Sequence, residues 1–169
     1  MNFQEACQLL NHWVAQSQGR FITLPSTSES SFRITKKYTH YELNYFEQKW
    51  GISFPQDYRE FLTTVGAGSY FIGKYGMGCI FHNLEDIEVL SSQIMEDEAT
   101  NLFPYLFLVV ALTYRGDEGG FDLNREGDNF SVFFHEAPPE IWTIETDRWS
   151  SFSDWVIKLV SSERDIDIP

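Results

Sequence analysis

Cysteine is scarce in this sequence, which contains only Cys7 and Cys79 among its 169 residues. Two cysteines so far apart do not form a disulfide framework, so packing and hydrogen bonds must hold the fold together. Reduced thiols are the ordinary state in the cytoplasm, and we expect a cytoplasmic protein. The opening residues, MNFQEACQLL, lack the basic segment of a signal peptide and carry Glu5 early, which supports the same expectation.

Long apolar runs are also missing. The longest, FPYLFLVVALTY at 103–114, contains Pro104 and is too short to cross a bilayer as a helix. Its continuous apolar character predicts instead a buried strand away from the sheet edge. We therefore expect no membrane partner.

Basic residues are few, with 12 Lys and Arg against 25 Asp and Glu, and the formal net charge is −13. Binding to nucleic acids and to anionic lipids depends mainly on lysine and arginine, so this balance argues against both partners. An acidic surface attracts a basic protein and speeds the encounter with it. The alternative is that the charge only keeps an aromatic-rich protein soluble.

Apolar residues, by contrast, are plentiful: 43% of the chain is hydrophobic and 17% is aromatic. A chain of this length buries about 70% of its unfolded surface, so it can form a substantial core. This composition excludes a disordered protein.

Helical spacing recurs in five segments. Thr39 and Glu42 form a capping-box pattern before the second helix, and Pro55 is placed in the first turn of a third, which Gly66 ends. The remaining helices are predicted at 3–16, after Asn83 and after Ser151.

Strand patterns occupy most of the second half of the chain. The segment at 17–32 is rich in Ser and Thr and is predicted to be a loop with room for one short edge strand. Helices first, strands next and a final helix predict an α+β fold, a single domain over 1–169 whose mainly antiparallel, twisted sheet is flanked by helices. The strands are predicted at 69–73, 105–114, 119–124, 129–136 and 141–145, the third and fourth forming a hairpin.

The acidic stretch GDEGGFDLNREGDNFSVFFHE at 116–136 is the obvious candidate for chemistry. Asp122, Asn124, Glu126 and Gly127 match the first half of a calcium loop. The twelfth position, which must supply a bidentate acid, is Phe133, so a calcium site is rejected.

An enzyme site is no better supported by the pattern. A small metal-dependent hydrolase using Asp117, Asp122 and His135 is a remote alternative, because no HExxH motif or cysteine pair accompanies these residues. The sequence has no nucleophile elbow, and its glycine-rich segment GAGSYFIGKYGMG lacks the spacing of a phosphate-binding loop. We therefore predict no catalytic residue, metal or cofactor, and expect the carboxylates of the stretch to face water or another protein.

The segment YELNYFEQKWGISFPQDYREFLTTVGAG resembles the signature of the SUKH superfamily, the Smi/Knr-type proteins. Similar pieces follow in the same order, namely NLEDIEVL, GDEGGFDLN, a hairpin ending in His135, and SFSDWVIKLV, so the resemblance covers about 38–160. Phe54 and Val65 depart from the usual Leu and Asn. The matching positions are Phe46, Glu47, Gly51, Pro55, Asp57, Tyr58, Phe61, Leu62 and Gly66.

The resemblance implies an α+β domain with the N-terminal helix 3–16 packed on it, and motif residues with structural roles. Many bacterial members resemble immunity proteins that neutralise polymorphic or contact-dependent toxins, often nucleases, and the family has no shared catalytic residues. We predict an acidic protein-binding module whose partner is a cognate basic toxin, a nuclease being the favoured class. A scaffold or regulatory protein of the same fold is the alternative, and the oligomeric state stays open. The predicted partner contacts are Glu96, Asp97, Glu98, Asp117, Glu118, Glu126 and Asp128.

Overall fold

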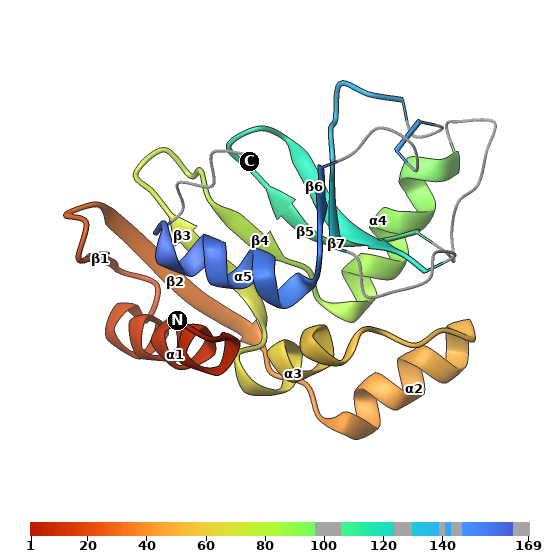
Figure 1. Ribbon diagram of the computed structural model, residues 1–169, viewed down its shortest axis with the longest axis horizontal. Coiled ribbons are helices and arrows are strands. Elements are labelled where there is room, and N and C mark those ends of the chain that lie inside the picture. The colour runs from red at the N-terminus through yellow and green to blue at the C-terminus, as the bar shows by residue number, and fades with distance from the viewer. Residues whose placement is uncertain (97–105, 124–129, 139–140, 143–146, 164–169) are drawn as a thin grey trace.

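The computed structural model describes residues 1–96, 106–123, 130–138, 141–142 and 147–163 (Figure 1). Within these ranges the chain forms five helices and one sheet of eight strands. The strands lie in the sheet in the same order as in the chain, and each neighbouring pair is antiparallel. The predicted α+β class with an antiparallel sheet is confirmed.

Helices interrupt this simple order of strands. The first helix precedes the sheet, two more stand between the second and third strands, one follows the fourth strand, and the last follows the eighth. The strands are β1 (Phe21–Thr23), β2 (Glu29–Lys36), β3 (Ala67–Ile72), β4 (Cys79–Phe81), β5 (Leu106–Leu112), β6 (Asp117–Asp122), β7 (Phe130–Phe133) and β8 (Asp147–Trp149). The helices are α1 (Phe3–Ser17), α2 (His40–Trp50), α3 (Gln56–Thr64), α4 (Leu84–Glu96) and α5 (Phe152–Ser161).

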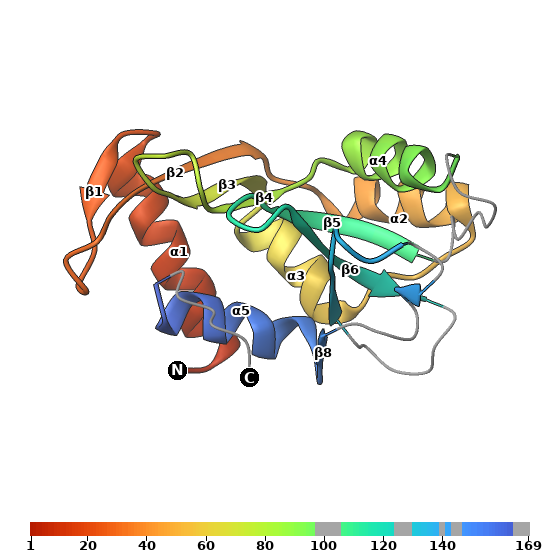
Figure 2. The ribbon, with the colours of Figure 1, turned by 90° about the horizontal axis from the view of Figure 1, so that it is seen from above.

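The helices cover the two faces of the sheet unequally. α1, α3 and α5 lie together on one face, whereas α4 lies on the other face with α2 beside it (Figure 2). A β-bulge in β5 near Leu108 frees the N–H of that residue, which donates to Ser91 Oγ of α4 over 3.1 Å. This hydrogen bond ties α4 to the centre of the sheet.

Local signals start α2 and α5 where the sequence predicts. Thr39 and Glu42 form a reciprocal capping box at α2, and the Ser151 side chain accepts from the Asp154 N–H at α5. Pro55 is the residue before α3 and not part of its first turn, so the predicted helix start was wrong by one residue.

The main core is aromatic and centres on Phe152 at the start of α5. This fully buried ring lies within aromatic contact distance of rings from three helices and three strands, because α5 crosses the middle of the sheet. Its ring neighbours are Phe3, Tyr58, Phe61, Phe81, Phe121, Phe130 and Trp155.

Two predicted segments differ from the structure. Most of the loop predicted at 17–32 is a β-hairpin, in which β1 and the first half of β2 pair through Phe21 and Ser31. Buried positions in this part of β2 alternate with exposed or half-buried ones, but one of the buried residues is Ser30, so the alternation of apolar residues was too weak to predict a strand. Of the strand predicted at 141–145, residues 141–142 form a short helical turn, and the strand β8 lies later.

Truncating the central ring tests this account of the core. We expect Phe152→Ala to lower the free energy of unfolding by about 3–5 kcal/mol, because it leaves a cavity among seven rings. Phe21→Ala, at an exposed ring on β1, is the matched control and should change the value by less than about 0.5 kcal/mol. Urea unfolding followed by circular dichroism measures both, and equal losses would contradict the proposed centre of the core.

Candidate functional site

Asp117 and Glu118, the first two residues of β6, each contact a histidine. Asp117 Oδ1 lies 3.1 Å from Nδ1 of His135 and also accepts from the backbone N–H of that residue over 3.1 Å. Glu118 Oε2 lies 3.2 Å from Nε2 of His82. Asp117 is only 3% exposed, so the expectation that its carboxylate faces solvent was wrong. The reason is that β6 places it beneath the turn that carries His135.

The hydrolase alternative required Asp122 to join Asp117 and His135. The two aspartates lie at opposite ends of β6, since Asp117 pairs with Leu112 and Asp122 pairs with Leu106. Five residue steps along an extended strand separate them by roughly 17 Å. In the part of the chain that the structure describes, no group of three or more His, Cys, Asp or Glu side chains could hold a metal ion.

Of the other predicted contact residues, only Glu96 lies within the described part of the chain. Glu96 is the last residue of α4. Asp97, Glu98, Glu126 and Asp128 lie outside the described residues. The role of these acids in partner binding stays a prediction.

A groove of about 220 Å³ lies between α2 and α4 on the described surface. Its floor consists of the buried side chains Tyr38, Phe46 and Leu84. We call it the α2–α4 groove and define it by its lining residues, which are Lys36, Tyr38, Tyr41, Glu42, Tyr45, Phe46, Lys49, Leu84, Glu85 and Glu88.

Two tyrosines form the α2 bank of the groove. Tyr41 is 78% exposed and Tyr45 is 64% exposed, four residues apart and therefore on the same face of the helix. Large aromatic rings are normally buried, so two neighbouring exposed rings mark a surface that another molecule could cover. The exposure of both tyrosines could have been predicted from the sequence, because they fall outside the apolar stripe of Leu43 and Phe46.

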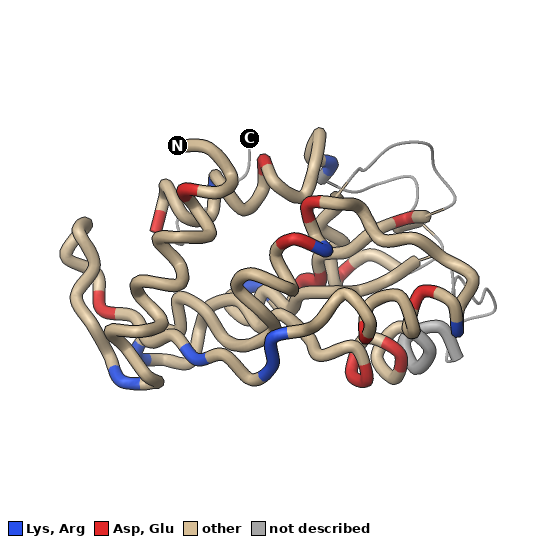
Figure 3. The backbone as a smooth tube through the Cα atoms, turned by 90° about the horizontal axis from the view of Figure 1, so that it is seen from below, with Lys and Arg blue, Asp and Glu red and all other residues tan. Residues whose placement is uncertain are grey.

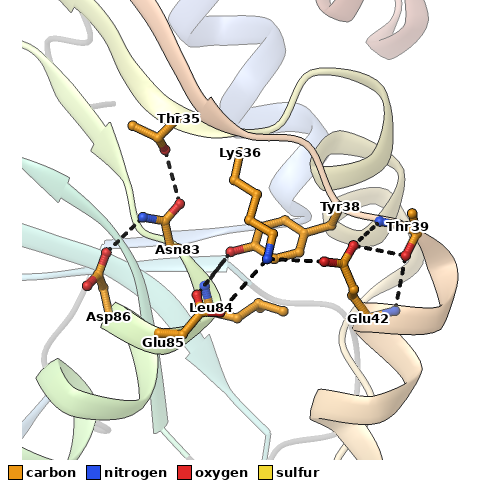
Figure 4. A network of polar contacts seen from close by, with 9 residues as sticks. All are labelled: Thr35, Lys36, Tyr38, Thr39, Glu42, Asn83, Leu84, Glu85 and Asp86. Carbon is orange, nitrogen blue, oxygen red and sulfur yellow. Dashed lines mark hydrogen bonds and ion pairs between the residues drawn. The ribbon is translucent and has the colours of Figure 1, made fainter.

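Tyr38 holds the groove floor and the start of α4 together. Its hydroxyl accepts from the backbone N–H of Leu84 over 2.8 Å, which satisfies one of the free N–H groups at the start of that helix (Figure 4). Asn83 precedes α4 as predicted, but its side chain accepts from Thr35 Oγ1 and donates to Asp86 instead. Burial raises the pKa of the Tyr38 hydroxyl well above its usual value, so it stays protonated.

Each lysine of the groove is paired with glutamate. Lys36 Nζ lies 3.1 Å from Glu42 and 3.9 Å from Glu85, and it sits above the Tyr38 ring (Figure 4). Lys49 Nζ lies 2.7 Å from Glu88, which joins α2 to α4. Three glutamates therefore face two lysines, and the lining keeps a negative excess.

The excess of negative charge continues outside the groove, on α4. α4 carries Glu85, Asp86, Glu88 and Glu96 and no lysine or arginine. Figure 3 shows acidic positions gathered on this helix and basic positions along the end of the sheet formed by β1–β3.

Comparison with known proteins agrees with this architecture. The sequence pattern of the SMI1/KNR4 family (SUKH-1) matches residues 38–158, which is most of the chain. This protein belongs to the SMI1/KNR4 family. A curated relative from Dickeya dadantii (strain 3937), named immunity protein RhsIB, is 34% identical over 161 residues, 95% of this chain and 96% of that protein.

The SMI1/KNR4 match begins at Tyr38 and includes both banks of the groove. Two acidic residues of the family motif accept hydrogen bonds that hold helices together. The buried carboxylate of Glu47 accepts from the Phe54 N–H over 2.7 Å and pairs with Arg59, which joins α2 to α3. Asp57 accepts from the Ser153 N–H over 2.7 Å, which joins α3 to α5.

None of the described helices is long and apolar enough to cross a membrane.

Removing one hydroxyl tests the link between the groove floor and α4. We expect Tyr38→Phe to lower the free energy of unfolding by about 1–3 kcal/mol, because the buried Leu84 N–H loses its acceptor. Hydrogen exchange of the α4 amides should rise more than that of α5. Tyr75→Phe, at a ring that is 82% exposed, is the matched control and should leave both values unchanged.

The pKa of Glu42 tests the polar network. Hydrogen bonds from the Thr39 backbone, then from Lys36 and the Thr39 hydroxyl, lower this pKa from its ordinary 4.5 to about 2. Because the folded value lies below the unfolded one, Glu42 stabilises the fold above about pH 4.5 and loses this effect as the pH falls towards 2. Carboxyl NMR titration should give a midpoint near 2 that rises in Lys36→Gln. A midpoint at 4.5 in the unsubstituted protein would contradict the network.

Proposed function

We propose that this protein is an immunity protein, which binds a cognate toxin and blocks its action inside the cell that makes both. The observation that carries this proposal is the 34% identity to a protein named immunity protein RhsIB, which extends over nearly the whole of both chains. A match of this length spans the segments that form the core, the groove and α4. Membership of the SMI1/KNR4 family supports the same conclusion.

We further propose that the toxin is a basic protein, with a nuclease as the favoured class. A nuclease must present lysine and arginine to the phosphates of its substrate. A chain with a net charge of −13 can compete for that basic surface and cover it. Inhibition then needs binding alone, and no step of chemistry by this protein.

Co-expression tests the proposed function. Where the neighbouring gene encodes an exported protein, the probe is the C-terminal domain of that protein, expressed alone and together with this chain in a host lacking both. We expect the domain to stop growth and this chain to restore it. The purified domain should also degrade nucleic acid, and an equimolar amount of this chain should abolish that activity. Unrelieved growth arrest would overturn the proposed function, whereas relief without any nuclease activity would overturn only the toxin class.

The charge argument makes a separate kinetic prediction. Raising the salt concentration from about 50 to 500 mM should slow association with the toxin domain at least about tenfold, because salt screens long-range steering. The dissociation rate should change much less. Surface plasmon resonance at several salt concentrations separates the two rates. An association rate independent of salt would show that the acidic surplus serves solubility and not recognition.

A further inference from the structure

We propose that the α2–α4 groove is where the toxin docks, and that it seats one arginine or lysine side chain of that toxin. The aliphatic part of this side chain would lie against the Tyr41 and Tyr45 rings, and its charge would face Glu85 and Glu88. This inference rests on the proposed function and adds the surface and the chemistry of contact.

The distribution of exposed apolar side chains selects this surface. Apart from Met1, large exposed hydrophobic residues of the described chain fall into two groups. The first consists of Tyr41 and Tyr45 on α2 and Val89 on the neighbouring α4. The second consists of Phe21 on β1, Tyr75 and Met77 between β3 and β4, and Ile80 on β4.

The charges around the two groups differ. Beside the second group Arg20, Arg33 and Lys74 are exposed, and the acids there are Glu29 on β2 and Glu163, which contacts Ser26 between β1 and β2. A basic toxin gains little electrostatic attraction there. The first group faces α4, on which every charged residue is acidic. Charge complementarity therefore favours the α2–α4 groove.

The dimensions of the groove favour a single side chain as its occupant. Small-molecule sites commonly measure about 300–1,000 Å³, and this groove measures about 220 Å³. Its floor is apolar apart from the Tyr38 hydroxyl, which accepts from the Leu84 N–H and donates to Glu85 Oε2 over 3.5 Å. A long side chain with an aliphatic stem and a charged end fits this combination of floor and rim.

The rim can accept a cation without losing its internal pairs. Glu85 is 74% exposed, and its nearest cation in the described chain, Lys36, is 3.9 Å away and closer to Glu42. The Glu85 carboxylate can therefore accept a further donor. Arginine suits the site well, because its planar guanidinium stacks on tyrosine and bonds a carboxylate with two N–H groups.

The tyrosines supply the contacts that determine how long the complex lasts. Tyrosine is enriched among the interface residues whose truncation costs most affinity, since it buries a large area while fixing only two torsions. Tyr41 and Tyr45 belong to a helix that Lys49 and Glu88 brace against α4, so little reorganisation is needed on binding.

Binding measurements with the toxin domain described above test the inference. Tyr41→Ala combined with Tyr45→Ala should weaken binding at least ~30-fold, mainly through faster dissociation. Glu85→Gln combined with Glu88→Gln should slow association and reduce its dependence on salt. Tyr75→Ala and Glu29→Gln repeat the same substitutions at exposed positions outside the groove and should change affinity less than about twofold.

The outcomes separate this inference from the proposed function. If the unsubstituted chain binds the domain but the tyrosine pair variant binds equally well, the groove is not the docking site and the immunity function stands. If the unsubstituted chain does not bind the domain at all, both the docking site and the immunity function are contradicted. Circular dichroism and thermal unfolding establish that each variant is folded, which is expected because all the substituted side chains are partly or fully exposed.

A double-mutant cycle identifies the occupant. Glu85→Gln is combined with alanine substitutions at each arginine and lysine of the toxin domain. One basic residue should show coupling, so that its loss costs at least ~fivefold less affinity when Glu85 is already neutral. Coupling to no basic residue would overturn the seating of a cation in the groove.

Discussion

The packing of Phe152 between α3 and the sheet is the contact on which the rest of the structure depends. Its ring neighbours come from α1, α3, β4, β6, β7 and α5, so one side chain joins segments from both ends of the chain. The adjacent N–H of Ser153 donates to Asp57 on α3. α3 in turn holds α2 through Glu47 and Arg59, and α2 forms one bank of the groove. The α2–α4 groove is thus connected to the aromatic core through the carboxylates of Glu47 and Asp57.

The acids of this protein divide into two groups with different roles. Glu47, Asp57 and Asp117 are buried or half-buried and accept hydrogen bonds from neighbouring elements, which compensates the cost of removing a carboxylate from water. Glu85 and Glu88 lie at the rim of a groove, where another molecule can reach them. Net charge alone does not distinguish the two groups of acids.

Much of the fold could be predicted because its signals are local. The capping box of Thr39 and Glu42 and the cap at Ser151 depend on residues three apart, and the continuous apolar run of β5 is itself evidence of burial. The hairpin of β1 and β2 was missed because one of its buried residues is Ser30, a polar residue that gives no apolar signal. Asp117 was misjudged because its hydrogen-bond partner, His135, lies eighteen residues later in the chain. Tyr41 and Tyr45 could have been found, because they lie off the apolar stripe of their helix.

The sequence by itself determined the α+β class, the helix starts, the sign of the charge and the resemblance to the family, since each is a property of composition or of neighbouring residues. Only the tertiary structure decided which carboxylates are buried, and it alone brought α2 and α4 side by side to form a groove. The two helices come from separate parts of the chain, and the ion pair of Lys49 with Glu88 joins residues 39 positions apart. No local pattern encodes such a distance, because it depends on how the whole sheet orders the segments between them.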